Sequence, residues 1–516
     1  MVQTVLEHHH DIRPGDAFLH NSPYHGNTHA ADHTIMVPVF ATDTTDRFWV
    51  HVKAHLADIG NSRPTTYAAF AADVYEEGAL IFPGVLVQRD NTEIGDIIRM
   101  CELRFRAPKD WYGDFNAMIA AARIGERRLV ELGDEIGWAE LDDYVDVWFH
   151  YSEQLMRRAV GRLKSGEVTV YNHYDPSKEL PEGISIRVHL KVDPQAGLIS
   201  ADLRDNPPCV RAGVNLSEAT ANGSVLTGVF TGLPIPVPAN AGSFRCVDIQ
   251  LAENCVVGIP RFPASCSAAT TNLSHRLVNT VARGMTDFGG GRAETGYLAP
   301  PAQGVISGRQ PQTNEPFVNQ IFLNIGAGGA SQWSDGWLLS TIAAAGMLYH
   351  DSVEILEQKY PIVVYDARIV ADREGAGRNI GAPGGRVEFG PIRTSLQVEY
   401  SADGKVNGAA GVQGGYSGAL TQIFVRRDGD VERMVEPFED SILLGPGDTV
   451  VTYAAGGAGF GDPFERDPAL VERDVRDGWV SVERARQVYG VFISATGDVD
   501  HHKTRKLRQA KANTRL

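Results

Sequence analysis

Cysteine is scarce in this chain of 516 residues. The five present are an odd number, and no two have the C-x-x-C spacing. The sequence therefore predicts neither a disulfide framework nor a cysteine zinc site, and small buried thiols are typical of a cytoplasmic protein. Only Cys266, in a turn of small residues, has a setting that would suit a nucleophile, and no paired base can be identified for it in the sequence.

Long apolar runs and basic charge are also lacking. The longest apolar run, around Trp337–Tyr349, is shorter than the ~20 residues of a membrane span. The first residues contain no apolar signal core, so export by that route is not expected. Lys and Arg number 48 against 64 Asp and Glu, a net charge of −16. This balance argues against nucleic acid or a membrane as the main partner.

A phosphate-binding loop is missing as well, although the chain has 54 glycines. The sequence Gly404-Lys405 is followed by Val406, so no G-x-x-x-x-G-K-[ST] motif exists, and no G-x-G-x-x-G follows a predicted strand. The glycine clusters are predicted to be turns. In the cluster at 326–329, the amides of Gly328 and Gly329 could instead bind an anionic part of a substrate.

The overall composition is that of a globular protein with an ample core, at 43% hydrophobic and 22% charged residues. The length favours about three domains. We expect an N-terminal region over residues 1–175, a central region over 176–360 and a β-rich region over 361–516 that ends in two short helices. The predicted fold class is α+β, with mixed helices and mostly antiparallel sheets.

Hydrophobic periodicity predicts the individual elements. Apolar residues at helical spacing favour helices over Asp114–Val130, Leu141–Lys164, Val214–Phe230, Leu273–Met285, Trp337–Leu356, Pro468–Asp477 and Val482–Tyr489. Alternating patterns favour strands over Thr34–Phe40, Phe48–Lys53, Ile184–Val192, Leu198–Leu203, Ile362–Val370, Arg386–Phe389, Ser395–Tyr400 and Ile423–Arg427.

Two copies of the spacing His-x-x-Asp flank the first predicted strand pair, at His29–Asp32 and His55–Asp58. Neighbouring strands could bring both pairs to the same end of a sheet, and His with carboxylate suits a divalent transition metal. A third copy at His8–Asp11 shows how readily the pattern arises by chance. From the residues alone, hydrogen-bonded or solvated histidines stay open as the alternative.

Longer motifs carry a family resemblance. The stretch PGDAFLHNSPYHGNTHAAD (Pro14–Asp32), the stretch AHLADIG (Ala54–Gly60) and the ending GGAGFGDP (Gly456–Pro463) resemble, in the same order, segments of the hydantoinase B/oxoprolinase family. The glycine-rich stretch at 326–330 with Asp335-Gly336 is also similar. The resemblance covers essentially the whole chain.

The sequence departs from the family pattern in several places. Asn21-Ser22 stands where many members have Asn-Asp, Asn27 replaces a glycine and Leu56 replaces a histidine. Family members also carry roughly a hundred further residues, the size of a small domain, before the stretch that begins at Pro14.

The resemblance implies a metal-bearing B-type subunit of an ATP-dependent enzyme. In such enzymes an A-type partner uses ATP and Mg to activate a small cyclic amide, such as a hydantoin or 5-oxoproline. The B-type chain then completes ring opening, so a hetero-oligomer is implied. A ketone carboxylase subunit is the alternative within the family. A metal-containing scaffold and a hydrolase that needs no partner are the alternatives outside these roles.

The resemblance also implies the metal ligands. His29, Asp32 and His55 would hold Zn, Mn or Fe and leave coordination positions open for water or substrate. Asp58 would be a fourth ligand or a general base, with a helix or turn cap as the alternative.

Further residues around these ligands are candidates for other roles. His25 and His33 could move protons, or could be supporting or surface histidines. Asn21 and Tyr24 could present an amide and a hydroxyl to substrate, although Asn21-Ser22-Pro23 is also typical of a simple turn.

Overall fold

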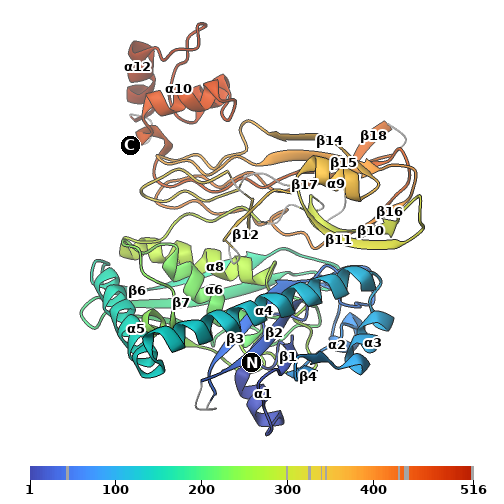
Figure 1. Cartoon of the computed structure of the whole chain (residues 1–516). Helices are drawn as coiled ribbons and strands as arrows, with labels where there is room; N and C mark the ends of the chain where they lie inside the picture. The colour runs from blue at the N-terminus through green and yellow to red at the C-terminus, as the bar shows by residue number, and fades with distance from the viewer. Residues whose placement is uncertain are drawn as a thin grey trace.

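The computed structural model describes residues 1–41, 46–297, 300, 302–323, 327–338, 340–342, 346–427, 430–434 and 441–512. Two layers and a small C-terminal group of helices make up the molecule (Figure 1). Gly326, part of the predicted anion-binding cluster, lies outside the described residues, as do 339 and 343–345 of the apolar run. No helix in the described ranges is both long enough and apolar enough to cross a membrane.

The first sheet is antiparallel and has the strand order β3-β2-β1-β4-β5. Helix α4 packs across β2 and β3. Its buried Trp111, Phe115, Met118 and Ala122 recur at helical spacing and form one apolar face against the sheet. The elements of this part are α1 (Val2–His8), β1 (Ala17–His20), β2 (Asp32–Phe40), β3 (Asp46–His55), α2 (Val74–Glu77), β4 (Val85–Arg89), β5 (Thr92–Glu93), α3 (Gly95–Arg104) and α4 (Pro108–Ile136).

The second sheet has the order β6-β7-β8-β9, and only its β8–β9 pair is parallel. Strand β7 alternates between buried and more exposed residues because one of its faces packs on the core, which also includes α6 and α8. Its elements are α5 (Trp138–Val160), β6 (Gly166–Tyr174), β7 (Ile184–Asp193), β8 (Leu198–Asp202), α6 (Glu218–Phe230), α7 (Ala241–Phe244), β9 (Val247–Gln250) and α8 (Leu273–Gly284), followed by the short 3₁₀ helix η1 (Met285–Phe288).

Two further antiparallel sheets form the upper layer and share one hydrophobic core. The predicted limit at residue 360 falls inside this layer, because β10 pairs with β16. One sheet has the order β11-β10-β16-β19 and the other β14-β15-β20-β17-β18. Their strands are β10 (Gln303–Arg309), β11 (Pro316–Phe322), β14 (Ile362–Ile369), β15 (Gly385–Pro391), β16 (Leu396–Glu399), β17 (Gln422–Arg427), β18 (Asp430–Met434), β19 (Ser441–Leu444) and β20 (Thr449–Tyr453).

A buried arginine joins the two layers. Arg276 of α8 is fully buried and donates two hydrogen bonds to Asp403, at 2.7 and 2.6 Å, and one to the carbonyl of Asn407 at 2.8 Å. Its guanidinium also lies 3.5 Å from the centre of the Tyr297 ring. Asp175, after β6, accepts from the backbone amides of residues 405–407. These contacts fix the loop below β16 on the lower layer.

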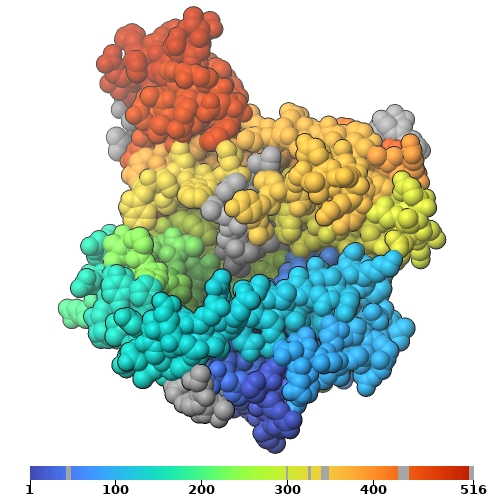
Figure 2. Space-filling view, viewed as in Figure 1, coloured from blue at the N-terminus to red at the C-terminus, as the bar shows by residue number. Residues whose placement is uncertain are grey.

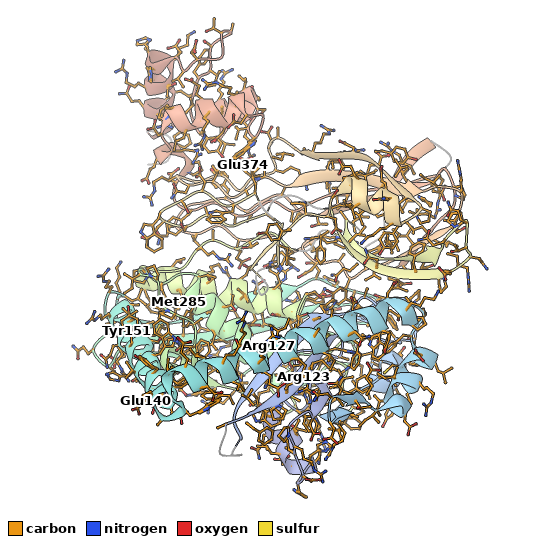
Figure 3. The ribbon with its side chains drawn as sticks, in the orientation of Figure 1. Arg123, Arg127, Glu140, Tyr151, Met285 and Glu374 are labelled. Carbon is orange, nitrogen blue, oxygen red and sulfur yellow. The ribbon has the colours of Figure 1, made fainter. Side chains whose placement is uncertain are left out.

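The C-terminal helices form a lobe on the upper layer (Figure 2). Glu374 lies between this lobe and the sheets (Figure 3), where its carboxylate accepts from Arg484 at 2.6 Å and from the Tyr489 hydroxyl at 2.8 Å. The lobe contains the 3₁₀ helix η2 (Pro463–Glu465), α10 (Pro468–Arg476), α11 (Val482–Gln487) and α12 (His501–Ala512).

The predicted α+β class is confirmed, and most predicted helices and strands are present. The helix predicted over Trp337–Leu356 is wrong. The described part of that segment contains the strand pair β12 (Ser340–Ile342) and β13 (Gly346–Leu348), and α9 (Val353–Lys359) begins only after Ser352 caps it. Gly346 and the preceding β-branched residues weaken a helix there. Helix α12 was not predicted, because its strongly polar sequence has no apolar stripe.

Candidate metal centre

Three predicted ligands meet at one end of the first sheet. Asp32 begins β2 and His55 ends β3, and the antiparallel register pairs these two residues directly. His29 lies in the turn just before β2. His29 Nε2 and His55 Nδ1 each lie 3.1 Å from Asp32 Oδ1, and 3.2 Å from each other. A nearly equilateral triangle of two nitrogens and one oxygen results.

Hydrogen bonds outside the triangle set the tautomers of both histidines. His29 Nδ1 donates to the carbonyl oxygen of Ser267 at 2.7 Å, so a neutral His29 presents an unprotonated Nε2 to the triangle. The Thr66 hydroxyl donates to the carbonyl of Leu56 at 2.7 Å and therefore accepts from His55 Nε2, at 3.3 Å. His55 Nδ1 is then also unprotonated. With both imidazoles neutral, three lone pairs thus converge, and a shared cation relieves their repulsion.

The charges at the triangle fit this assignment. Burial opposes protonation of His29, but the Asp32 carboxylate outweighs it and raises the pKa of His29. Burial likewise opposes ionisation of Asp32, yet the two imidazoles hold its pKa well below the usual range. Burial lowers the pKa of His55. Asp32 is therefore an anion that needs a positive partner, which can be a proton on His29 or a metal ion.

The geometry fits a transition metal. Ligand atoms about 2.1 Å from one ion lie roughly 3.0–3.4 Å apart in octahedral or tetrahedral coordination, which matches the observed separations. Two histidines and one carboxylate on one face form a ligand set that Fe, Mn and Zn share. Three protein ligands leave positions open, as in catalytic rather than structural sites.

A cavity of about 510 Å³ opens at the triangle. The exposed fraction of the side chains rises from 1% at His29 to 14% at Asp32 and 26% at His55, so the cluster faces the cavity from one side. The Tyr67 ring stacks on His55, with the ring centres 5.2 Å apart. The other walls come from α6, the turn before α8, the first turn of α8, and β11, with Thr220, Ser224, Thr270, Ser274 and Gln320.

Residues 1–463 match the family model described as hydantoinase B/oxoprolinase. The chain belongs to this family. The beta subunit of caprolactamase from Pseudomonas jessenii is 29% identical over 97% of this chain and 86% of its own length. The crystal structure of ATP-dependent caprolactamase from Pseudomonas jessenii has a TM-score of 0.83 at 25% identity, covering 97% of this chain and 86% of that chain.

The structure of an acetone carboxylase also matches this chain. It has a TM-score of 0.88 at 19% identity, covering 100% of this chain and 74% of that chain. The chain therefore shares its fold with an ATP-dependent caprolactamase and with an acetone carboxylase.

Asp58 does not join the other ligands in this hydantoinase B/oxoprolinase family member. Its Oδ2 accepts from the backbone amides of Arg106 and Ala107, the latter at 3.0 Å, just before α4 begins at Pro108. Its Oδ1 accepts from the amide of Gly60 at 3.2 Å. The carboxylate caps the turn that leads into α4, so the structure favours the capping role over a general base.

His33 points away from the centre. Successive residues of a strand face opposite sides, so His33 lies across β2 from Asp32. Its ring packs against Phe82 and Phe105, its Nε2 has no hydrogen-bond partner among the described residues, and burial lowers its pKa to about 3. His33 does not line the cavity, so its position favours a supporting histidine over the proton-shuttle role.

The buried neutral His33 makes stability depend on pH. Between pH 6.5 and about 3 the unfolded chain binds a proton at this residue and the folded chain does not, so the free energy of unfolding falls as pH falls. We expect His33→Leu to flatten this dependence by up to about 1.4 kcal/mol per pH unit. Urea unfolding in chelator from pH 4.5 to 7.5 measures the slopes. The exposed His25, changed to Leu, is the control, and parallel curves for His33→Leu and wild type would contradict the prediction.

The other side chains predicted to contact substrate or move protons form hydrogen bonds within the protein instead. Asn21 is buried and bonds the backbone at Ala30, Leu80 and Phe82, which leaves no group for substrate. The Tyr24 hydroxyl donates to the carbonyl of Ala264 at 2.6 Å. His25 is exposed, and its Nδ1 lies 2.8 Å from the hydroxyl of Ser22. None of the three lines the cavity.

Gly328 and Gly329 also lie outside the cavity lining. A Cβ on Gly328 would lie 2.6 Å from the Trp337 backbone, and one on Gly329 would lie 2.2 Å from the carbonyl oxygen of Ala293. Close backbone packing therefore explains both glycines. Cys266 is buried, and burial raises its pKa well above the usual range, so it is a thiol rather than a nucleophile.

Sequence reasoning missed the residues that complete the centre. Tyr67 and Thr66 lie beyond the second motif, and Ser267 and Thr270 lie more than 200 residues from His29. No spacing rule links them to the ligands. Only the packing of the turn before α8 on the end of the first sheet brings them together.

Proposed function

We propose that this chain is the metal-bearing B-type subunit of an ATP-dependent enzyme that opens cyclic amides. One observation carries the proposal: His29 Nε2, Asp32 Oδ1 and His55 Nδ1 converge at the wall of a cavity large enough for a small ring. The similarity to the caprolactamase beta subunit supports the amide reaction.

The chain's own residues would orient the substrate. Ring opening breaks the carbonyl C–N bond, adds the hydroxyl of water to the carbon and returns a proton to the nitrogen. The metal, when bound, supplies a Lewis acid that polarises a carbonyl oxygen or lowers the pKa of water. The Tyr67 hydroxyl accepts from Gln320 at 2.7 Å and donates to no other described residue, and burial raises its pKa. It is thus a protonated donor, available to a substrate oxygen.

ATP use is assigned to an A-type partner. The chain has neither of the two phosphate-loop motifs, and its relative is one subunit of an ATP-dependent enzyme. An unactivated amide is a poor electrophile, so activation by the partner would precede the step at this centre.

Turnover by separate and combined chains tests the proposal. We expect ring opening of ε-caprolactam or hydantoin, followed by chromatography, only with this chain, an A-type subunit and ATP together. Ring opening by the isolated chain without ATP would instead indicate a hydrolase that needs no partner. Full activity of the complex with a metal-free His29→Ala chain would indicate a scaffold. If a ketone is converted to a product that carries the label of added labelled bicarbonate, the enzyme is a carboxylase.

A further inference from the structure

A second, apolar cavity lies beside the metal centre. This α6 side pocket has a volume of about 740 Å³ and is lined by Leu226, Phe230, Leu233, Ile235, Val237 and Phe244 among others. It shares two lining residues, Gly223 and Thr227, with the cavity at the metal cluster. Because these two residues are four apart in α6, they lie on one face of the helix and form a common wall.

Part of the wall between the two cavities carries no side chain. Gly223 has no side chain, and a Cβ placed on it would meet no atom within 4 Å. The pocket lining also includes Pro234 and Pro236, whose rings fix the backbone φ angle at two positions of the wall. A preformed apolar pocket next to a reactive centre is a typical place for a ligand's apolar part.

The charges at the two cavities limit what can bind. No lysine or arginine is among the described residues that line either cavity. Lys53, beside Thr28, donates to Asn27 and lines neither. A substrate that carries its own carboxylate, as 5-oxoproline does, would find no lysine or arginine among these residues. An uncharged ring with an apolar substituent fits both cavities.

We propose that the α6 side pocket holds an apolar substituent of the substrate whose ring lies at the metal centre, so that this chain selects uncharged cyclic amides with a bulky alkyl or aryl group. This inference rests on the proposed function for the position of the ring. It adds the substrate class. It also names Gly223, in the wall that the two cavities share, as the residue whose missing side chain lets the substituent extend from one cavity into the other.

Binding of three probes to the metal-loaded chain tests this inference without ATP or turnover. The probes are hydantoin, 5-benzylhydantoin and hydantoin-5-acetic acid, measured by ligand-observed NMR titration. We expect 5-benzylhydantoin to bind at least about tenfold more tightly than hydantoin, because the apolar surface of its benzyl group is buried in the pocket and removed from water. The acid should bind no more tightly than hydantoin.

Gly223→Leu should close the passage. Leucine is a better helix former than glycine, so loss of folding is not expected. The variant should lose the preference for the benzyl compound, so that 5-benzylhydantoin binds no more tightly than hydantoin. Gly113→Leu is the matched control, because Gly113 is also a helical glycine with open space around it and lines neither cavity.

Several outcomes would overturn the inference. Equal binding of hydantoin and 5-benzylhydantoin, a preference that survives in Gly223→Leu, or no binding of 5-benzylhydantoin up to its solubility limit would each do so. Loss of association with the A-type subunit in Gly223→Leu, with the probe preference unchanged, would identify the pocket as a subunit contact instead. A preference for the benzyl probe without ATP-dependent turnover would support the pocket and reject the proposed function, and the reverse result would reject the pocket alone.

Discussion

Replacing His29 or His55 by alanine is expected to strip the chain of its transition metal while the fold stays intact. Each variant removes one of three ligand atoms that lie 3.1–3.2 Å apart. Loss of an outer partner typically costs 10–100-fold in metal affinity, so loss of a ligand should cost more than about 100-fold. The metal content measured by elemental analysis should fall from roughly one ion per chain in wild type to a small fraction of that in each variant.

Asp58→Asn provides the matched control for the metal ligands. Asp58 belongs to the second His-x-x-Asp motif, but its carboxylate caps the start of α4 rather than facing the centre. This variant should keep its metal and lose about 1 kcal/mol of stability. Circular dichroism and thermal unfolding report on folding in all variants. A wild-type chain that takes up no metal on titration, or a His29→Ala chain that binds as well as wild type, would remove the metal assignment.

Replacing Arg276 by methionine is expected to cost about 3–5 kcal/mol of stability, because it leaves buried carboxylates without their cation. Arg276 is fully buried, bonds Asp403 through two nitrogens and reaches Asp175 at 3.5 Å. These partners come from both layers, so the variant should also loosen the upper layer on the lower one. Urea unfolding gives the stability, and hydrogen exchange in residues 401–407 reports the loosening.

Two further variants sharpen this prediction. The double variant Arg276→Met/Asp403→Asn should recover part of the loss, because it removes an unpaired charge. Arg204→Met, which breaks an exposed pair with Asp202, should unfold like wild type, since water screens such pairs. If the Arg276→Met and Arg204→Met variants have the same free energy of unfolding, Arg276 does not hold the two layers together.

Much of the fold could be read from local patterns. The apolar stripe of α4 and the alternation of β7 predicted these elements because each buries one face against a core. The same reasoning failed between Trp337 and Leu356, where an apolar run without a clear period is ambiguous between helix and strand. It also missed α12, whose sequence is polar around the whole helix.

The candidate centre divides in the same way. Motifs at the ends of two neighbouring strands indicated two His-x-x-Asp pairs, and the family resemblance indicated His29, Asp32 and His55 as the ligands. Spacing alone could not separate Asp32 from Asp58, which lie equally far from a histidine. Nor could it find Ser267, Tyr67 or the α6 side pocket. Those depend on contacts between segments far apart in the chain, and such contacts form only when the layers pack.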